Sequence, residues 1–267
     1  MVLTVAALRG ALGFLTRVPV GRDEGSWAAF AGAPWTFPVV GYLVGAVVAL
    51  PLLAPAPAPT VALAFPLTVY AVTGITHLDG VADLGDAAVV HGGPEERREV
   101  MKDSALGVGG TVALVAVVLG LATAALGLVE AATATGPAGG GGSRVAGGVA
   151  VAAGIVVAAE VGAKAATATL VCVGDAAHEG LGSALTDGVG PGAALPALAL
   201  AAPAALLAWP RLLSGVAALL AALATAGLVR RWARRRIGGV SGDVLGATNE
   251  LARIAALHAG VIAWTRF

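Results

Sequence analysis

The chain has 267 residues, of which 58% are hydrophobic and only 12% charged. A soluble domain carries about 45–50% apolar and about 25% charged residues, so this excess of apolar side chains indicates a membrane protein. The net charge of zero gives no field that would favour nucleic acid, and the single cysteine, Cys172, excludes a disulfide within the chain.

The first 35 residues are predicted to form an interfacial segment. Residues 2–16 are predicted to be a helix lying at the membrane surface. Arg9 and Arg17 interrupt the apolar stretch, and no clear small-residue cleavage site follows it, so a cleaved signal peptide is not predicted.

Apolar stretches long enough to span a membrane, about 20 residues each, follow along the rest of the chain. They lie at 36–54, 59–76, 106–129, 146–172, 189–208, 211–229 and 250–265. The first and last are short or interrupted. The sequence therefore predicts an all-α, polytopic bundle of six or seven spans, with residues 1–267 forming one integral-membrane domain.

Three short connections are predicted between these spans. The run Pro55–Pro59 reads as a stiff turn, Gly139–Gly142 as a flexible loop, and Pro210 as the tip of a tight hairpin.

The basic residues predict the orientation of the chain in the cell membrane. If the N-terminus is inside and seven spans follow, the outside segments hold only Arg144, Arg211 and Arg266. The inside segments hold Arg9, Arg17, Arg22, Arg97, Arg98, Lys102, Arg230, Arg231, Arg234, Arg235 and Arg236. This positive-inside bias places the polar segments 77–104, 173–188 and 230–250 together on the cytoplasmic side, which favours an enzyme acting at that face.

The strongest candidate site lies in the segment His77–Asp86. On a helix, Asp79, Asp83 and Asp86 share one face, and clustered carboxylates repel one another unless a cation lies among them. Such oxygen ligands suit Mg²⁺, which proteins commonly bind through one or two carboxylates and substrate phosphates. The alternative is a solvated polar helix end.

Three further groups of residues are candidates for the same chemistry. Lys102 and Asp103 precede a glycine-containing helix start, where Ser104 could instead be a simple N-cap. The segment Gly238–Glu250, with Asp243 and a preceding arginine cluster, resembles a phosphate or metal loop. For those arginines, anchoring to anionic lipid is an equal alternative. Glu160 and Lys164 lie four residues apart inside a span, where ionisable groups indicate function, although a structural pair is the alternative.

In its motifs the chain resembles the cobalamin synthase family, the adenosylcobinamide-GDP ribazoletransferases. The matching motifs are FLTRVPV at 14–20, Pro38 with Gly41 and Gly45, THLDGVADLGDA at 76–87, MKDSALGVGG at 101–110, GLG at 180–182 and GGVSGDVLGATNE at 238–250. The resemblance implies that adenosylcobinamide-GDP and α-ribazole, or its 5′-phosphate, are joined with release of GMP, with Mg²⁺ as the cofactor.

The resemblance also suggests a role for each candidate residue. His77, Asp79, Asp83 and Lys102 are expected to be catalytic. Substrate contacts are expected from Lys164, Arg236, Gly239 and Gly242. The expected metal ligands are Asp79, Asp83, Asp86, Asp103 and Asp243.

Two other functions stay open on the sequence. A lipid synthase of the CDP-alcohol phosphotransferase type would use similar aspartates, but Asp83 stands where its motif has arginine. An ion-coupled transporter would need acidic residues near the middle of several spans, and only Glu160 comes close. Gly41 and Gly45 can pack helices within a chain or between copies, which leaves a homo-oligomer open.

Overall fold

The structure is a computed structural model that describes residues 5–21, 23–134 and 141–267, without the side chains of 141–145. Arg22, Gly139, Gly140 and the side chain of Arg144, which entered the predictions above, lie outside this description. Within the described residues the chain is helical, and the only β pairing is an isolated bridge between Ala176 and Val240.

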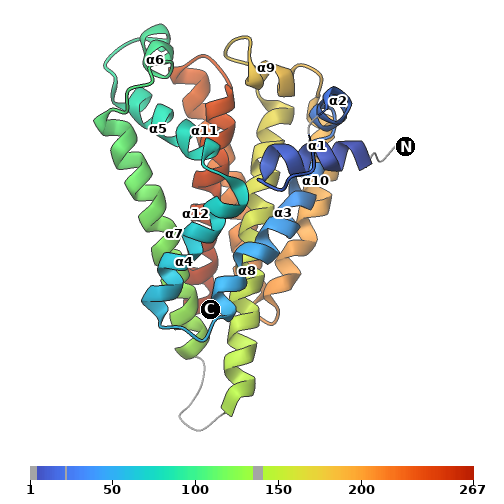
Figure 1. The fold of residues 1–267 in the computed structure, drawn as a ribbon, viewed down its shortest axis with the longest axis vertical. Coiled ribbons are helices and arrows are strands. Elements are labelled where there is room, and N and C mark those ends of the chain that lie inside the picture. The colour runs from blue at the N-terminus through green and yellow to red at the C-terminus, as the bar shows by residue number, and fades with distance from the viewer. Residues whose placement is uncertain (1–4, 22, 135–140) are drawn as a thin grey trace.

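Among the described residues, five helical segments are long and apolar enough to cross a membrane (Figure 1). They are α3 with η1 (Thr36–Leu53), α7 (Val108–Ala134), α8 (Gly141–Val173), η2–α10–η3 (Pro191–Ala208) and α11 (Leu212–Arg236). The predicted all-α polytopic fold is confirmed. Gly141 and Gly142 begin α8 rather than continuing the predicted flexible loop.

A sixth span is counted only if two helices are taken together across a bend. Helix α4 (Ala58–Thr73) turns by 105° into α5 (Thr76–Val89). The turn is at Gly74, whose φ of 77° is a conformation that favours glycine. The span predicted at 59–76 is therefore mainly α4, and α5 runs on as a separate helix outside the apolar spans, at one end of the bundle (Figure 1).

The stretch predicted as the last span is part of a longer, buried helix. Helix α12 (Gly242–Arg266) runs alongside α11 through the bundle (Figure 1). At 25 residues α12 is long enough to cross a membrane. Its composition does not qualify it as a span, because Asn249, Glu250 and Arg253 interrupt its apolar character. These three side chains are nevertheless at most 1% exposed, because neighbouring helices cover them.

The polar elements gather at one end of the bundle. Figure 1 places α5, α6 (Pro94–Val100) and α9 (Leu181–Thr186) there, whereas the C-terminus lies toward the other end. Helices α1 (Val5–Leu15) and α2 (Glu24–Ala31) flank the polar end, with α1 lying across the direction of the spans. This arrangement agrees with the predicted clustering of polar segments.

Two glycines allow α3 to pack closely against α8. A Cβ atom on Gly41 would lie 2.8 Å from the Cα of Val161, and one on Gly45 would lie 2.7 Å from the Cα of Val157. Both glycines thus serve packing within one chain, and the homo-oligomer stays a prediction.

We expect Gly45→Leu to destabilise the fold, because the added side chain would meet the backbone of α8. Overpacking of this kind costs about 1–3 kcal/mol. The measurement is thermal unfolding of the detergent-purified protein. Gly227→Leu is the matched control, since nothing lies within 4 Å of a Cβ at that helical position. Equal melting temperatures for the two variants would contradict the packing argument.

Candidate active site

Two helices bring the predicted aspartates together at the polar end. At Gly80 of α5 an added Cβ would lie 2.5 Å from the carbonyl oxygen of Asp243, so the first turn of α12 rests directly on α5. Burial, followed by the charges of Asp243, Asp79 and Asp86, raises the pKa of Asp83 to about 7. Four carboxylates therefore act on one another here, and a cation among them would relieve their repulsion.

Asp86 has a structural partner of its own. Its carboxylate accepts hydrogen bonds from the backbone N–H groups of Gly107 and Gly110, each at 2.8 Å. Asp86 thus accepts hydrogen bonds from N–H groups at the start of α7 that have no partner within the helix. On the sequence alone, Ser104 is the candidate for this capping role. A negative charge is also favourable at a helix N-terminus.

Two other predicted residues, Lys102 and Asp103, belong to the segment that connects α6 to α7. Lys102 and Asp103 are exposed. The carboxylate of Asp103 accepts from the N–H of Ala105 at 3.0 Å. Across the described residues, no three His, Cys, Asp or Glu side chains are already placed to hold a metal ion. The carboxylates of α5 and α12 are close enough to interact but do not form a closed metal cage.

A cavity of about 910 Å³ opens beside the α5–α12 crossing. One wall consists of His77, Gly242, Asp243, Gly246 and Asn249. Another part of the lining comes from α1 and α2, including Phe14 and Trp27. This volume lies within the range of about 300–1,000 Å³ that is typical of small-molecule sites. The cavity is thus a candidate substrate site with a polar wall and an aromatic wall.

Beneath the cavity lies a buried network of charged side chains. Arg253 donates hydrogen bonds to both Glu160 and Glu250. Lys164 donates to Glu160 at 3.1 Å and to the side-chain oxygen of Asn249 at 3.3 Å. Two acids and two bases are paired here, as buried charges require.

This network extends to His77 in the cavity wall. The Nδ1 of His77 lies 3.2 Å from Nδ2 of Asn249 and 3.5 Å from Oε1 of Glu250. The hydroxyl of Tyr70 donates to the other oxygen of Glu250 at 3.2 Å. The His77 ring is therefore held through Nδ1, and its side chain is 16% exposed.

The residues predicted to contact substrate lie in different surroundings. Gly242 lines the cavity, whereas Arg236 is exposed at the end of α11. Lys164 is fully buried in the charge network. Gly239 is buried, and a Cβ there would lie 2.5 Å from the carbonyl oxygen of Asp175, so it permits the close approach of two loops.

Part of the predicted phosphate or metal loop is helical, which corrects the prediction for 242–250. Ser241 caps α12 by accepting a hydrogen bond from the N–H of Val244 at 3.3 Å. Asn249 and Glu250 consequently lie inside the bundle. Arg253, Tyr70 and the cavity-lining His178 were not predicted as site residues. The spacing of Glu250 and Arg253, three residues apart in an apolar stretch, was the available signal.

Comparison with known proteins gives a consistent result. A family model described as cobalamin-5-phosphate synthase matches residues 7–261. A relative from Halorubrum lacusprofundi, named adenosylcobinamide-GDP ribazoletransferase, is 76% identical over 267 residues, which cover 100% of both chains. Relatives of the same name are 47% identical in Haloquadratum walsbyi (98% of this chain, 99% of theirs) and 32% identical in Escherichia coli O157:H7 (93% and 96%). No solved structure matches the chain.

Proposed function

Because the chain belongs to the cobalamin-5-phosphate synthase family, we propose that the cavity beside the α5–α12 crossing is where its two substrates are joined. The activity is that of an adenosylcobinamide-GDP ribazoletransferase, an enzyme of cobalamin biosynthesis. The single observation that carries the proposed location is the contact of α5 with α12, which gathers four carboxylates beside the cavity of about 910 Å³.

The reaction is a phosphoryl transfer between two substrates. The 3′-hydroxyl of α-ribazole, or of its 5′-phosphate, attacks the phosphorus attached to cobinamide. The bond from that phosphorus to GMP breaks, and GMP leaves. Such reactions depend mainly on positioning and on neutralising charge, which a cavity walled by fixed helices can provide.

The carboxylates of α5 and α12 fit a Mg²⁺ ion. Asp79, Asp83 and Asp243 would hold it, together with substrate phosphate oxygens, since Mg²⁺ seldom needs a cage made of protein alone. When bound, the ion would supply positive charge to the phosphate oxygens. The pKa of Asp83 is raised first by burial and then by the charges of Asp243, Asp79 and Asp86, and the repulsive part of this effect supports a cation at this place. Asp86 is a weaker candidate because two N–H groups already occupy its oxygens.

His77 is the residue placed to receive the proton from the attacking hydroxyl. In the tautomer whose Nδ1–H faces Oε1 of Glu250, at 3.5 Å, Nε2 carries no proton and can accept one from substrate, and His77 lines the cavity. Lys102 and Arg236 lie on exposed surface at the same end, where they would meet the pyrophosphate only if the substrate reaches beyond the cavity. Lys164 would act through Asn249 and not by direct contact.

The site would lie on the cytoplasmic side of the cell membrane. The structure places the polar segments at one end, as Figure 1 shows for α5, α6 and α9. Half of the 16 arginines and lysines lie in the polar segments 77–104 and 230–250, and such residues favour the cytoplasmic side. Both substrates would then reach the cavity from the cytoplasm, near the lipid surface.

The experiment follows GMP release from adenosylcobinamide-GDP by the purified protein in lipid nanodiscs. We expect release only when α-ribazole and Mg²⁺ are both present, with loss on adding EDTA and recovery with excess Mg²⁺. The corrinoid product is checked by mass spectrometry. Undiminished release in EDTA would refute the metal proposal, and release without a joined product would refute the proposed transfer.

A further inference from the structure

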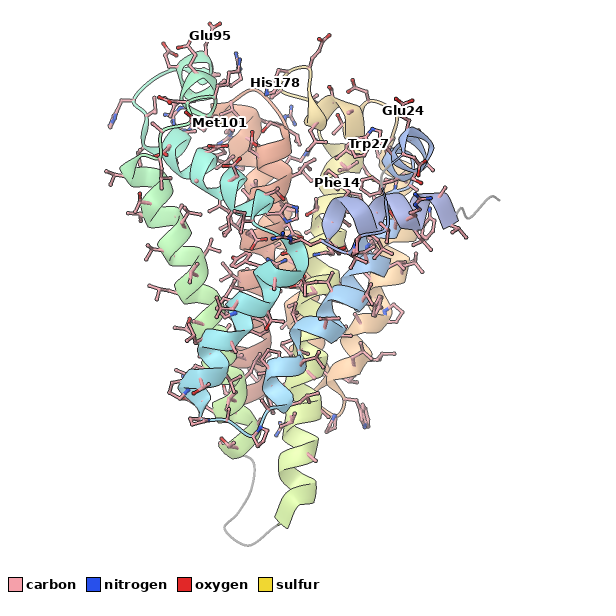
Figure 2. All side chains as sticks on the ribbon, viewed as in Figure 1. Phe14, Glu24, Trp27, Glu95, Met101 and His178 are labelled. Carbon is pink, nitrogen blue, oxygen red and sulfur yellow. The ribbon has the colours of Figure 1, made fainter. Side chains whose placement is uncertain are left out.

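The cavity has an aromatic wall that the proposed chemistry does not yet use. Phe14 and Trp27 lie with their ring centroids 5.4 Å apart, and both line the cavity. Figure 2 shows them next to each other on the N-terminal helices. Phe30 packs behind, with ring centroids 5.2 Å from Phe14 and 5.7 Å from Trp27.

These rings differ in how far they are covered. Phe30 is 0% exposed and belongs to the core, and Phe37, at 2%, continues the stack toward α3. Phe14 and Trp27 are only partly buried, so they are the members of the cluster that can offer surface to a ligand. The buried rings fix the position of the partly buried ones, which makes this a prepared surface for a flat ring.

Two charged groups near the aromatic wall, Arg9 and Asp23, are already paired. The carboxylate of Asp23 accepts from the N–H and from the hydroxyl of Ser26, each at 2.8 Å. Arg9 forms an ion pair with the same carboxylate at 3.2 Å and donates to the carbonyl of Val20 at 2.7 Å. Arg9 and Asp23 are thus engaged with protein atoms, and a base bound mainly through its face depends on them less than guanine, whose edge is recognised by hydrogen bonds.

The size of the cavity also limits what can enter. About 910 Å³ holds a nucleoside, whereas adenosylcobinamide-GDP combines a corrin ring, an adenosyl group and a nucleoside diphosphate. That substrate is larger than the ligands that sites of about 300–1,000 Å³ enclose. Its corrin ring is therefore expected at the mouth of the cavity, and the interior has room for a nucleoside, for which a base bound through its face is the better match to the aromatic wall.

We propose that Phe14 and Trp27 stack on the heterocyclic base of the nucleoside acceptor, α-ribazole, and thereby direct its ribose toward His77 and Asp243. This inference rests on the proposed function. Aromatic stacking suits the base because every flat base has a π face. The two walls of the cavity then have separate tasks, with base binding on α1–α2 and phosphoryl transfer on α5–α12.

The test compares Trp27→Ala with Trp27→Phe in steady-state assays in which each substrate is varied while the other is saturating. For Trp27→Ala, we expect the KM for α-ribazole to rise about 10-fold or more. The KM for adenosylcobinamide-GDP should change less than about twofold, because the substitution removes only the surface on which the base of α-ribazole stacks. Trp27→Phe should restore most of the affinity for α-ribazole. Trp209→Ala is the matched control, since Trp209 is 69% exposed and does not line the cavity.

Several outcomes separate this inference from the proposed function. An unchanged KM for α-ribazole in an active Trp27→Ala protein would refute the stacking alone. A rise only in the KM for adenosylcobinamide-GDP would assign the wall to the corrinoid substrate instead. If Trp27→Ala does not accumulate, Phe14→Leu removes one ring while keeping apolar volume, and the same KM comparison decides. Absence of turnover in the unmodified protein would refute the proposed function itself.

Discussion

Asp83→Asn is expected to reduce GMP release by about 100- to 1,000-fold, the loss typical when one charge-stabilising group is removed from an active site. The substitution keeps the size of the side chain and removes its charge. Because Asp83 is partly buried and faces the charges of Asp243, Asp79 and Asp86, its neutralisation should also relieve repulsion and leave the fold intact. Activity and thermal unfolding are both measured, and Mg²⁺ titration should show a weaker dependence on the ion.

Two further substitutions make this prediction specific. Asp187→Asn, at an exposed aspartate at the same end of the bundle, should keep activity within about twofold. Asp86→Asn should lower stability more than Asp83→Asn does, since it weakens two hydrogen bonds to the start of α7. Near-normal activity in a folded Asp83→Asn protein would remove this residue from the proposed metal site.

Most of the spans were predictable, because length and apolar content decide whether a helix can cross a membrane, whereas the stretch 250–265 belongs to the more polar α12. Helix α7 contains all but two residues of the predicted stretch 106–129. The bend between α4 and α5 was not predicted, although Gly74 was its signal in the sequence. Periodicity finds helices but does not give the angle between two consecutive ones, because packing decides that angle.

The sequence predicted which residues belong to the candidate site better than it predicted how these residues are arranged in space. The spacing of Asp79, Asp83 and Asp86 indicates a shared helix face, and α5 is a helix over this range. The spacing does not reveal that Asp86 turns to the start of α7, since this contact joins residues 21 and 24 positions apart. The cavity could not be predicted either, because α1 and α2 form one of its walls only after they fold back against the bundle.

The buried charge network gives the second large prediction. Arg253→Leu is expected to destabilise the protein by about 3–5 kcal/mol, because Glu160 and Glu250 would keep their charges in the interior without their shared partner. Arg253 is 0% exposed, so water cannot replace the lost guanidinium. The expected observations are a low yield of folded protein and a marked fall in the melting temperature in detergent.

A matched pair of variants separates charge from packing in this network. Arg234→Leu makes the same replacement at an exposed position on α11 and should leave the melting temperature nearly unchanged. Arg253→Lys keeps the positive charge but cannot reach two carboxylates in the planar geometry of arginine, so an intermediate stability is expected. Because Glu250 also contacts His77, Arg253→Lys should lower kcat more than either KM. A folded Arg253→Leu protein that melts at the unmodified temperature would show that the network does not stabilise the fold.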